Sequence, residues 1–240
     1  MVELILASQS PRRRELVKLL GYPVRPVSAD VDESLVTDAD PAVNVVRTAR
    51  LKAVEIADQW RQANAHGDVV HREDVVHRED VVYKDVFIVA ADTTVALANE
   101  MLGKPTDMAD ARRMLRILRN RAHEVHTGVV MIELKTGREV KGVNTAVVTM
   151  RDYSDAEIEA YIASGDPMDK AGAYAIQHSI FRPAARLDGC FTGVMGLSVC
   201  HLLQLFPQLG LTVQADLTAV AAAHQYFPCP LLDEIAANLV

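Results

Sequence analysis

Apolar strand patterns alternate with amphipathic helix patterns along most of the chain, and this order limits the possible folds more than any single motif does. The run 86–91 is apolar throughout, as in a strand buried on both faces, and 107–119 places its apolar residues at helical spacing. Further strands are expected at 4–7, 22–27, 125–134, 139–150 and 172–176, and further helices at 10–20, 41–65, 154–164, 197–206 and within 216–240. The order predicts an α/β fold: a mixed sheet with flanking helices.

A hexad repeat interrupts this alternation. DVVHRE occupies residues 68–73 and 74–79, and DVVYKD follows at 80–85. On an α-helix a six-residue step turns the pattern by about 240°, so the paired valines spread around the helix. On a strand adjacent valines point to opposite faces. Because neither structure gives one apolar face, we interpret 68–85 as a surface insertion, either disordered or a protruding ribbon, without a catalytic role.

Charge and hydropathy exclude some classes of function. The 240 residues include 32 acidic and 25 basic side chains, a formal net charge of -7. Stable nucleic-acid binding needs a basic face and is not expected. The longest apolar run, 86–98, is broken by Asp92 and is too short to span a membrane. Glu3 precedes the N-terminal apolar stretch and the arginines follow it, the reverse of a signal peptide, so a cytoplasmic protein is expected.

The cysteines and histidines show no metal-binding spacing. Cys190, Cys200 and Cys229 lie far apart and form no C-x-x-C pair, and their odd, small number is typical of a reducing compartment. His123 and His126 are separated by three positions, which differs from the HExxH spacing of zinc enzymes. The sequence therefore predicts neither a zinc motif nor a histidine metal site.

A possible anion site lies at the first strand-to-helix turn. Ser8, Ser10 and Pro11 form a turn and a helix start, followed by Arg12, Arg13 and Arg14. Free backbone N–H groups at a helix start attract anions, and arginine holds phosphate oxygens with two parallel hydrogen bonds. This segment indicates a phosphate site, although a solvated basic helix start would have the same pattern.

Polar residues elsewhere extend this hypothesis. Asp92 directly follows an apolar strand, where open α/β sheets place their ligands, and could bind Mg²⁺ or accept a proton from water; a turn-capping role is the alternative. Glu33 is a candidate second carboxylate. Lys104, between Gly103 and Pro105, and Lys52, on a predicted helix, are candidate phosphate ligands. Gln177, after the strand predicted at 172–176, offers both donor and acceptor to a base edge.

Several motifs, in order, resemble those of the Maf family. They are LILASQSPRRREL at 4–16, VDES at 31–34, ARLKA at 49–53, VAADTTVAL at 89–97, GKP at 103–105, HEVHTGV at 123–129 and GDPMDKAGAYAIQ at 165–177. The resemblance implies two lobes around a deep cleft, related to the inosine-triphosphate pyrophosphatases. It also implies a family domain at 1–211, interrupted by the insertion, with a C-terminal helical extension at 212–240.

The resemblance further implies an activity: hydrolysis of a nucleoside triphosphate to its monophosphate and pyrophosphate with a divalent metal, Mg²⁺ or Mn²⁺. This activity implies a role in cleaning nucleotide pools. Members are also described as septum-formation inhibitors, which implies a link to division arrest. A homodimer is implied as well. Carried over from the family, Asp92 is the proton acceptor, Glu33 and Lys104 act with it in catalysis, Glu33 and Asp92 bind the metal, and Ser8, Arg13 and Lys52 bind substrate.

Substrate choice follows from three further positions. Arg12, Thr93 and Gln177 match the residues that separate the dTTP/UTP branch of the family from the 7-methyl-GTP branch, and the form DKAGAYAIQ resembles the dTTP/UTP branch. Two alternatives stay open. One is the same chemistry on 7-methyl-GTP or another modified nucleotide. The other is a regulator of septum formation that binds nucleotide without turnover.

Overall fold

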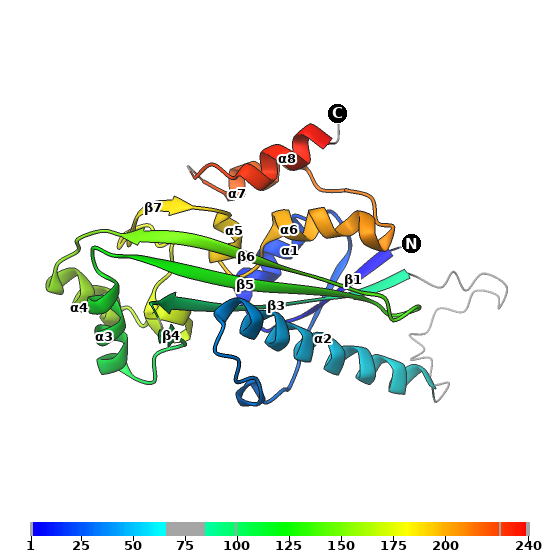
Figure 1. The fold of residues 1–240 in the computed structure, drawn as a ribbon, viewed down its shortest axis with the longest axis horizontal. Helices are drawn as coiled ribbons and strands as arrows, with labels where there is room; N and C mark the ends of the chain where they lie inside the picture. The colour runs from blue at the N-terminus through cyan, green and yellow to red at the C-terminus, as the bar shows by residue number, and fades with distance from the viewer. Residues whose placement is uncertain (1, 66–84, 99, 226, 239–240) are drawn as a thin grey trace.

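A mixed β-sheet forms the centre of the molecule. The computed structural model describes residues 2–65, 85–98, 100–225 and 227–238, and within them seven strands pair in the order β2-β1-β3-β5-β6-β7, with β4 beside β3 (Figure 1). Their bounds are β1 Val2–Ala7, β2 Val24–Val27, β3 Asp85–Leu97, β4 Glu100–Leu102, β5 Ala122–Glu133, β6 Glu139–Met150 and β7 Ala184–Asp188. The α/β class and the mixed sheet predicted from the sequence are confirmed. Residues 66–84, most of the hexad repeat, lie outside the described part.

Strand β3 changes partners along its length. Its first half pairs parallel with β1 as far as Val89, opposite Leu6, and its last residues pair antiparallel with β4 from Val95 onward. Strand β5 pairs antiparallel with the other edge of β3 from Phe87 to Ala96. Among the described strands, none pairs with residues 90–94 on the β1 side. The ends of β1 and β4 therefore flank a gap in the sheet, and Asp92 lies in it.

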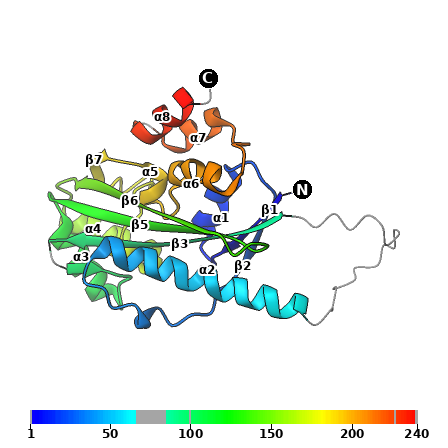
Figure 2. The same ribbon diagram turned by 45° about the vertical axis from the view of Figure 1, so that its right-hand side comes forward.

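Helices cover both faces of the sheet (Figures 1 and 2). Because side chains alternate along a strand, Ile5 packs under α2 with Ala53 while Leu4 points to the opposite face and packs with Leu16 of α1. Both faces of β1 are thus buried, as its apolar sequence predicts. The helices are α1 Pro11–Lys18, α2 Pro41–Ala65, α3 Met108–Leu118, α4 Asp155–Ala163, α5 Phe191–Val194, α6 Val199–Leu205, α7 Leu217–Ala223 and α8 Pro230–Asn238.

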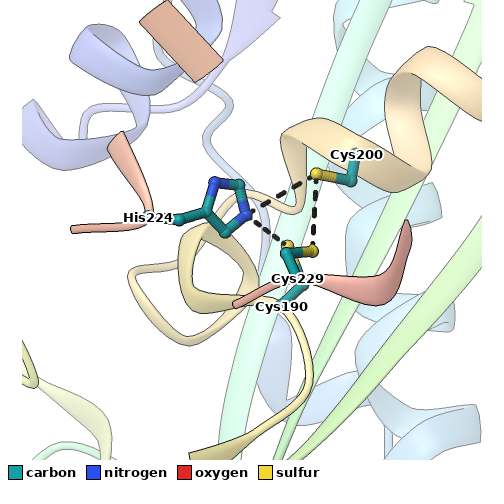
Figure 3. Close-up of side chains that lie close together, drawn as sticks. All are labelled: Cys190, Cys200, His224 and Cys229. Atoms are coloured by element: carbon teal, nitrogen blue, oxygen red, sulfur yellow. Dashed lines mark hydrogen bonds between the residues drawn. The ribbon is translucent and has the colours of Figure 1, made fainter. Parts of the chain in front are cut away.

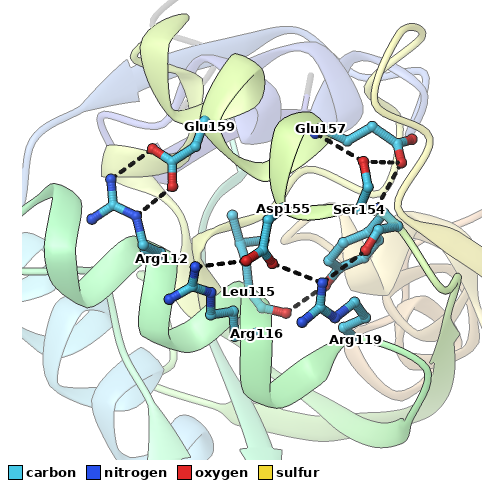
Figure 4. A network of polar contacts seen from close by, with 9 residues as sticks. Arg112, Leu115, Arg116, Arg119, Ser154, Asp155, Glu157 and Glu159 are labelled. Atoms are coloured by element: carbon cyan, nitrogen blue, oxygen red, sulfur yellow. Dashed lines mark hydrogen bonds and ion pairs between the residues drawn. The ribbon is translucent and has the colours of Figure 1, made fainter.

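At the far end of the sheet, α3 and α4 pack together and are linked by ion pairs (Figure 4). Asp155 contacts both Arg116 and Arg119 at 2.8 Å. Beneath them the buried Tyr153 donates its hydroxyl to the Leu115 carbonyl at 2.7 Å. Exposed ion pairs contribute about 0–1 kcal/mol each, so the apolar contacts under this network hold the two helices together.

Several local predictions are confirmed, and two are wrong. Helices α2 and α3 occur as expected, and Ser154 and Glu157 form the predicted capping box. The strand predicted at 172–176 is absent: this segment begins in a 3₁₀ turn with Gly172 at φ +69°, and the nearby strand is β7. The apolar strand does not end at Asp92 either, because pairing with β5 continues through residues 92–96.

The C-terminal segment packs on the outside of α6. Val220 of α7 and Ile235 of α8 are buried in the same apolar cluster as Leu202 of α6 and Leu4 of β1. Figure 1 shows α7 and α8 stacked above α6 on the side of the sheet opposite α2. Within the described ranges, no helix has both the length and the apolar character that a membrane span requires.

Candidate active site

A cavity of about 740 Å³ opens at the gap in the sheet. Its size is in the usual range for small-molecule sites. All nine residues that the sequence marks as site candidates line it: Ser8, Arg12, Arg13, Glu33, Lys52, Asp92, Thr93, Lys104 and Gln177. They come from separate parts of the chain, and the gap explains why they meet. Strand β1 ends beside it just before Ser8, β3 passes it with Asp92, and β4 ends beside it before Lys104.

The turn between β1 and α1 forms one wall. Ser8 Oγ accepts the backbone N–H of Ser10 at 3.2 Å, and the Ser10 side chain caps α1 by accepting the N–H of Arg13. Pro11 occupies the first helical position, where no N–H is required. The first turn of α1 thereby faces the cavity, and its backbone dipoles favour an anionic ligand there.

Arg13 is held by a directed chain of hydrogen bonds. Its Nε donates to the Gly196 carbonyl at 2.7 Å and its Nη2 to Thr93 Oγ1 at 3.3 Å. Thr127 donates its hydroxyl to the Gly193 carbonyl at 2.8 Å, so the 2.9 Å contact between the two threonines has Thr93 as donor. Burial lowers the pKa of Arg13, and the charge of Asp92 opposes that shift. Arginine stays protonated nonetheless, so this series of hydrogen bonds fixes a positive charge beside the cavity.

Lys52 joins the two candidate carboxylates. Its Nζ lies 2.7 Å from Asp92 Oδ1 and 2.9 Å from Glu33 Oε1. Lys52 comes from α2 and is only 8% exposed, whereas Glu33 begins an exposed 3₁₀ turn, Glu33–Leu35. A buried ammonium needs such partners, because an unpaired charge away from water is strongly unfavourable. One lysine therefore sets the relative positions of both carboxylates.

The residues expected to select the base come from three segments: the first turn of α1, strand β3 and the turn at Gln177. Arg12 Nη1 lies 3.6 Å from Asp169 Oδ2, and Gln177 sits half-buried in a turn rather than at the end of a strand. Thr93 takes part in fixing Arg13, so its hydroxyl proton is already donated and one lone pair remains for a ligand. Lys104 is exposed at the rim, after β4.

Lys170 is a cavity residue that sequence reasoning missed. It is buried, and its Nζ contacts the Asp169 carboxylate at 2.5 Å and the Asp166 carboxylate at 3.1 Å. Tyr161 donates to the other oxygen of Asp166 at 2.6 Å. Gly172 then packs against Val95, where an added Cβ would lie 3.0 Å from the nearest valine atom. The polar side chains of loop 165–172 thus stabilise its conformation through ion pairs and hydrogen bonds, a role that composition alone does not reveal.

The fold and the cavity together define a class of protein. An α/β sheet opens at a gap where fixed cationic groups surround two carboxylates, an arrangement suited to a polyanionic ligand and a hard cation. The family model described as Maf-like protein matches residues 3–209. The chain belongs to the Maf family.

Curated relatives extend over nearly the same region. A protein named dTTP/UTP pyrophosphatase from Dictyoglomus thermophilum is 38% identical over 209 residues, covering 87% of this chain and 96% of the relative. One with the same name from Agathobacter rectalis is 38% identical over 219 residues, covering 89% and 100%. Another from Geotalea uraniireducens is 38% identical over 211 residues, covering 86% and 95%. The family model ends before α7, so both tail helices lie beyond it.

Proposed function

We propose that this chain hydrolyses a nucleoside triphosphate, dTTP or UTP, to the monophosphate and pyrophosphate. The observation that carries the proposal is the cavity itself, in which Arg13, Lys52 and Lys104 surround Asp92 and Glu33. The names of the relatives support the same activity. Water attacks the α-phosphorus, the bond from that phosphorus to the α–β bridging oxygen breaks, and pyrophosphate leaves.

The cationic groups bind the triphosphate. Arg13 is held in place before any ligand arrives, so its charge requires little reorganisation when negative charge grows on the departing pyrophosphate. Lys104 at the rim and the first turn of α1 supply further attraction for phosphate oxygens. Ser8, beside that turn, adds a hydroxyl to the same wall.

The carboxylate pair fits a hard divalent cation. Lys52 occupies one oxygen of each carboxylate, Oδ1 of Asp92 and Oε1 of Glu33, and each group keeps a second oxygen. Mg²⁺ is usually bound by one or two carboxylates, substrate phosphates and water, and Mn²⁺ accepts the same ligands. Glu33 and Asp92 would hold the ion, which would neutralise charge on the phosphates.

Asp92 accepts the proton of the attacking water. Lys52 contacts Oδ1, so the proton goes to a lone pair of this carboxylate that neither Lys52 nor the ion would occupy. Gln177 reads the base, because its amide can pair with both the N3–H donor and the O4 acceptor of thymine or uracil. Arg12, held near Asp169, and the remaining lone pair of Thr93 complete the recognition.

Three finer expectations rest on the family resemblance alone. We expect a homodimer, a cytoplasmic location where nucleotide pools are cleared, and a link to septum formation. Sedimentation of the purified chain measures the first directly. None of them is needed for the chemistry above.

A triphosphate panel tests the proposal. Pyrophosphate release is measured with dTTP, UTP, 7-methyl-GTP and dATP, and the two pyrimidines are expected to react fastest. Preference for 7-methyl-GTP would refute the base assignment, and stoichiometric binding without pyrophosphate would refute the enzyme. Asp92→Asn is expected to lower kcat by about 10²–10⁴-fold with triphosphate binding retained. Asp58→Asn, an exposed change on α2, is the matched control, and normal turnover by Asp92→Asn would refute its role.

A further inference from the structure

Four side chains far apart in sequence meet on the side of the sheet opposite α2 (Figure 3). They are Cys190 before α5, Cys200 in α6, His224 after α7 and Cys229 before α8. All four are between 0% and 5% exposed. Their ligand atoms all lie within 4.8 Å of one another. None of them lines the cavity of the candidate active site.

Three of the distances between these atoms match tetrahedral coordination. Zn–S bonds of about 2.3 Å and Zn–N bonds of about 2.05 Å place two sulfurs about 3.8 Å apart and sulfur and nitrogen about 3.6 Å apart in a regular tetrahedron. In the structure Cys229 Sγ lies 3.8 Å from Cys200 Sγ, and His224 Nε2 lies 3.4 Å from Cys190 Sγ and 3.6 Å from Cys200 Sγ. The side chains need little movement to enclose an ion.

Neighbouring groups orient two of the four ligands. His224 Nδ1 donates to the Val220 carbonyl at 2.8 Å, so Nε2 faces the sulfurs and is the nitrogen that can offer a lone pair to a metal. Thr192 Oγ1 accepts the N–H of Val199 at 3.2 Å and lies 3.1 Å from Cys190 Sγ, so its hydroxyl is placed to donate to a Cys190 thiolate. Partners of this kind are typical of metal-bound histidine and thiolate.

We propose that Cys190, Cys200, His224 and Cys229 bind a structural Zn²⁺ ion. Three thiolates and one imidazole in a tetrahedral arrangement select zinc among the common divalent ions. Four protein ligands close the coordination sphere, as in structural sites, and burial keeps substrate away from it. Cys190 and Cys200 lie in the region matched by the family model, whereas His224 and Cys229 lie beyond it. The ion therefore fastens the C-terminal helices to the core.

A disulfide is the main competing interpretation. A bond between Cys200 and Cys229 requires the sulfurs to approach from 3.8 Å to about 2.05 Å. Such a disulfide would not explain why His224 Nε2 is directed at the sulfurs. A zinc ion uses all four side chains, so the convergence of the histidine with three cysteines favours the metal.

Metal analysis of the full-length chain, purified without chelators, tests the proposal. We expect one zinc per chain, and in Cys229→Ser or His224→Ala the loss of most of it. His178→Ala, a histidine outside the cluster, is the matched control and should keep its zinc. Glu33→Gln with Asp92→Asn should also keep it, which separates this site from a metal held by the cavity carboxylates. These readouts do not depend on pyrophosphatase activity.

Cobalt substitution of the unaltered protein keeps the test decisive if a variant does not fold. Exchange with Co²⁺ should produce intense visible bands and a thiolate-to-metal charge-transfer band, which carboxylate ligands do not give. Absence of zinc and of these bands, with three thiols titrating in the folded protein, would overturn the proposal. A Cys200–Cys229 disulfide found by mass spectrometry in the metal-free protein would overturn it, and so would iron in place of zinc.

Discussion

The cavity and the cysteine–histidine cluster are built in opposite ways around groups that would bind cations. In the cavity, Lys52 already neutralises part of the charge on Asp92 and Glu33, and the walls stay open to receive a ligand. In the cluster, four buried ligand atoms converge, and solvent is excluded. A site for turnover keeps open coordination positions, and a site for folding fills them. We therefore expect changes to the two regions to separate activity from stability.

The largest effect is expected from Lys52→Met, which removes the ammonium and keeps the length of the side chain. The two carboxylates then lose their shared partner and repel each other, so kcat should fall by about 10³-fold, or about 4 kcal/mol. Pyrophosphate release measures this. Lys18→Met, an exposed lysine of α1 paired with Glu15, is the control. Loss of zinc from Lys52→Met would break the separation of the two regions, as would a kcat near that of the unaltered protein.

The loss of stability in acid is expected to come from His123, in the core beside the cavity, and not from the cysteine–histidine cluster. Burial lowers the pKa of His123 to about 4, and its Nε2 lies 2.7 Å from the hydroxyl of Tyr174, a cavity residue. The unfolded chain, with a histidine pKa of about 6.5, binds more protons than the folded one between these values. The contribution of His123 to the free energy of unfolding is therefore fully present above pH 6.5, and up to about 3 kcal/mol of it is lost as the pH decreases to 4.

The measurement is urea unfolding as a function of pH. His123→Gln should flatten the slope between pH 4 and pH 6.5, since glutamine does not titrate. His178→Gln, which replaces a half-buried histidine, is the control. If the slope persists in His123→Gln and follows zinc release instead, the cluster and not His123 determines acid stability.

A smaller effect is expected from Arg13→Lys. Lysine keeps the charge, but a single ammonium does not reproduce the planar geometry with which Arg13 holds Gly196 and Thr93 together. We expect kcat/KM to decrease by about 10–100-fold, or about 1.4–2.7 kcal/mol. Arg14→Lys, at the next and exposed position, should change it little. Equal values for the two variants would mean that charge alone, without positioning, is what the cavity requires.

The sequence predicts the cavity better than the cluster for a physical reason. Asp92 follows an apolar run and Ser10 precedes a proline at a helix start, so local patterns mark both as polar positions beside strand ends. The sequence suggests that residues 95–98 continue this strand past a bend, but it does not predict the unbroken path through Asp92, which depends on the long-range pairing with β5. The segment 172–176 was misassigned because Gly172 takes a left-handed conformation that only its packing on Val95 explains.

The cluster has no local signal at all. Its ligands are separated by ten residues, twenty-four residues and five residues, and none of these spacings matches a zinc motif. They meet because Val220 and Ile235 bring the tail helices onto the apolar face of α6. Tertiary packing creates this site, whereas several cavity residues stand in local patterns that the sequence already shows, such as the helix start after Ser10 and the polar Asp92 after an apolar run.

The smallest expected effect on activity follows from zinc removal. A thiol-selective chelator should strip the cluster, and assays in excess Mg²⁺ keep the carboxylate pair supplied, because Mg²⁺ prefers oxygen ligands. Arg13 remains held by Gly196 and Thr93, so kcat/KM should change by less than about twofold, or about 0.4 kcal/mol. The tail helices lose their attachment, and limited proteolysis after residue 210 should become much faster. Restored resistance on adding Zn²⁺, but not Mg²⁺, is the control. A large loss of activity with the tail still protected would contradict this expectation. It would show that loss of the zinc ion shifts Gly196, through α5 and α6, and that the two regions are coupled.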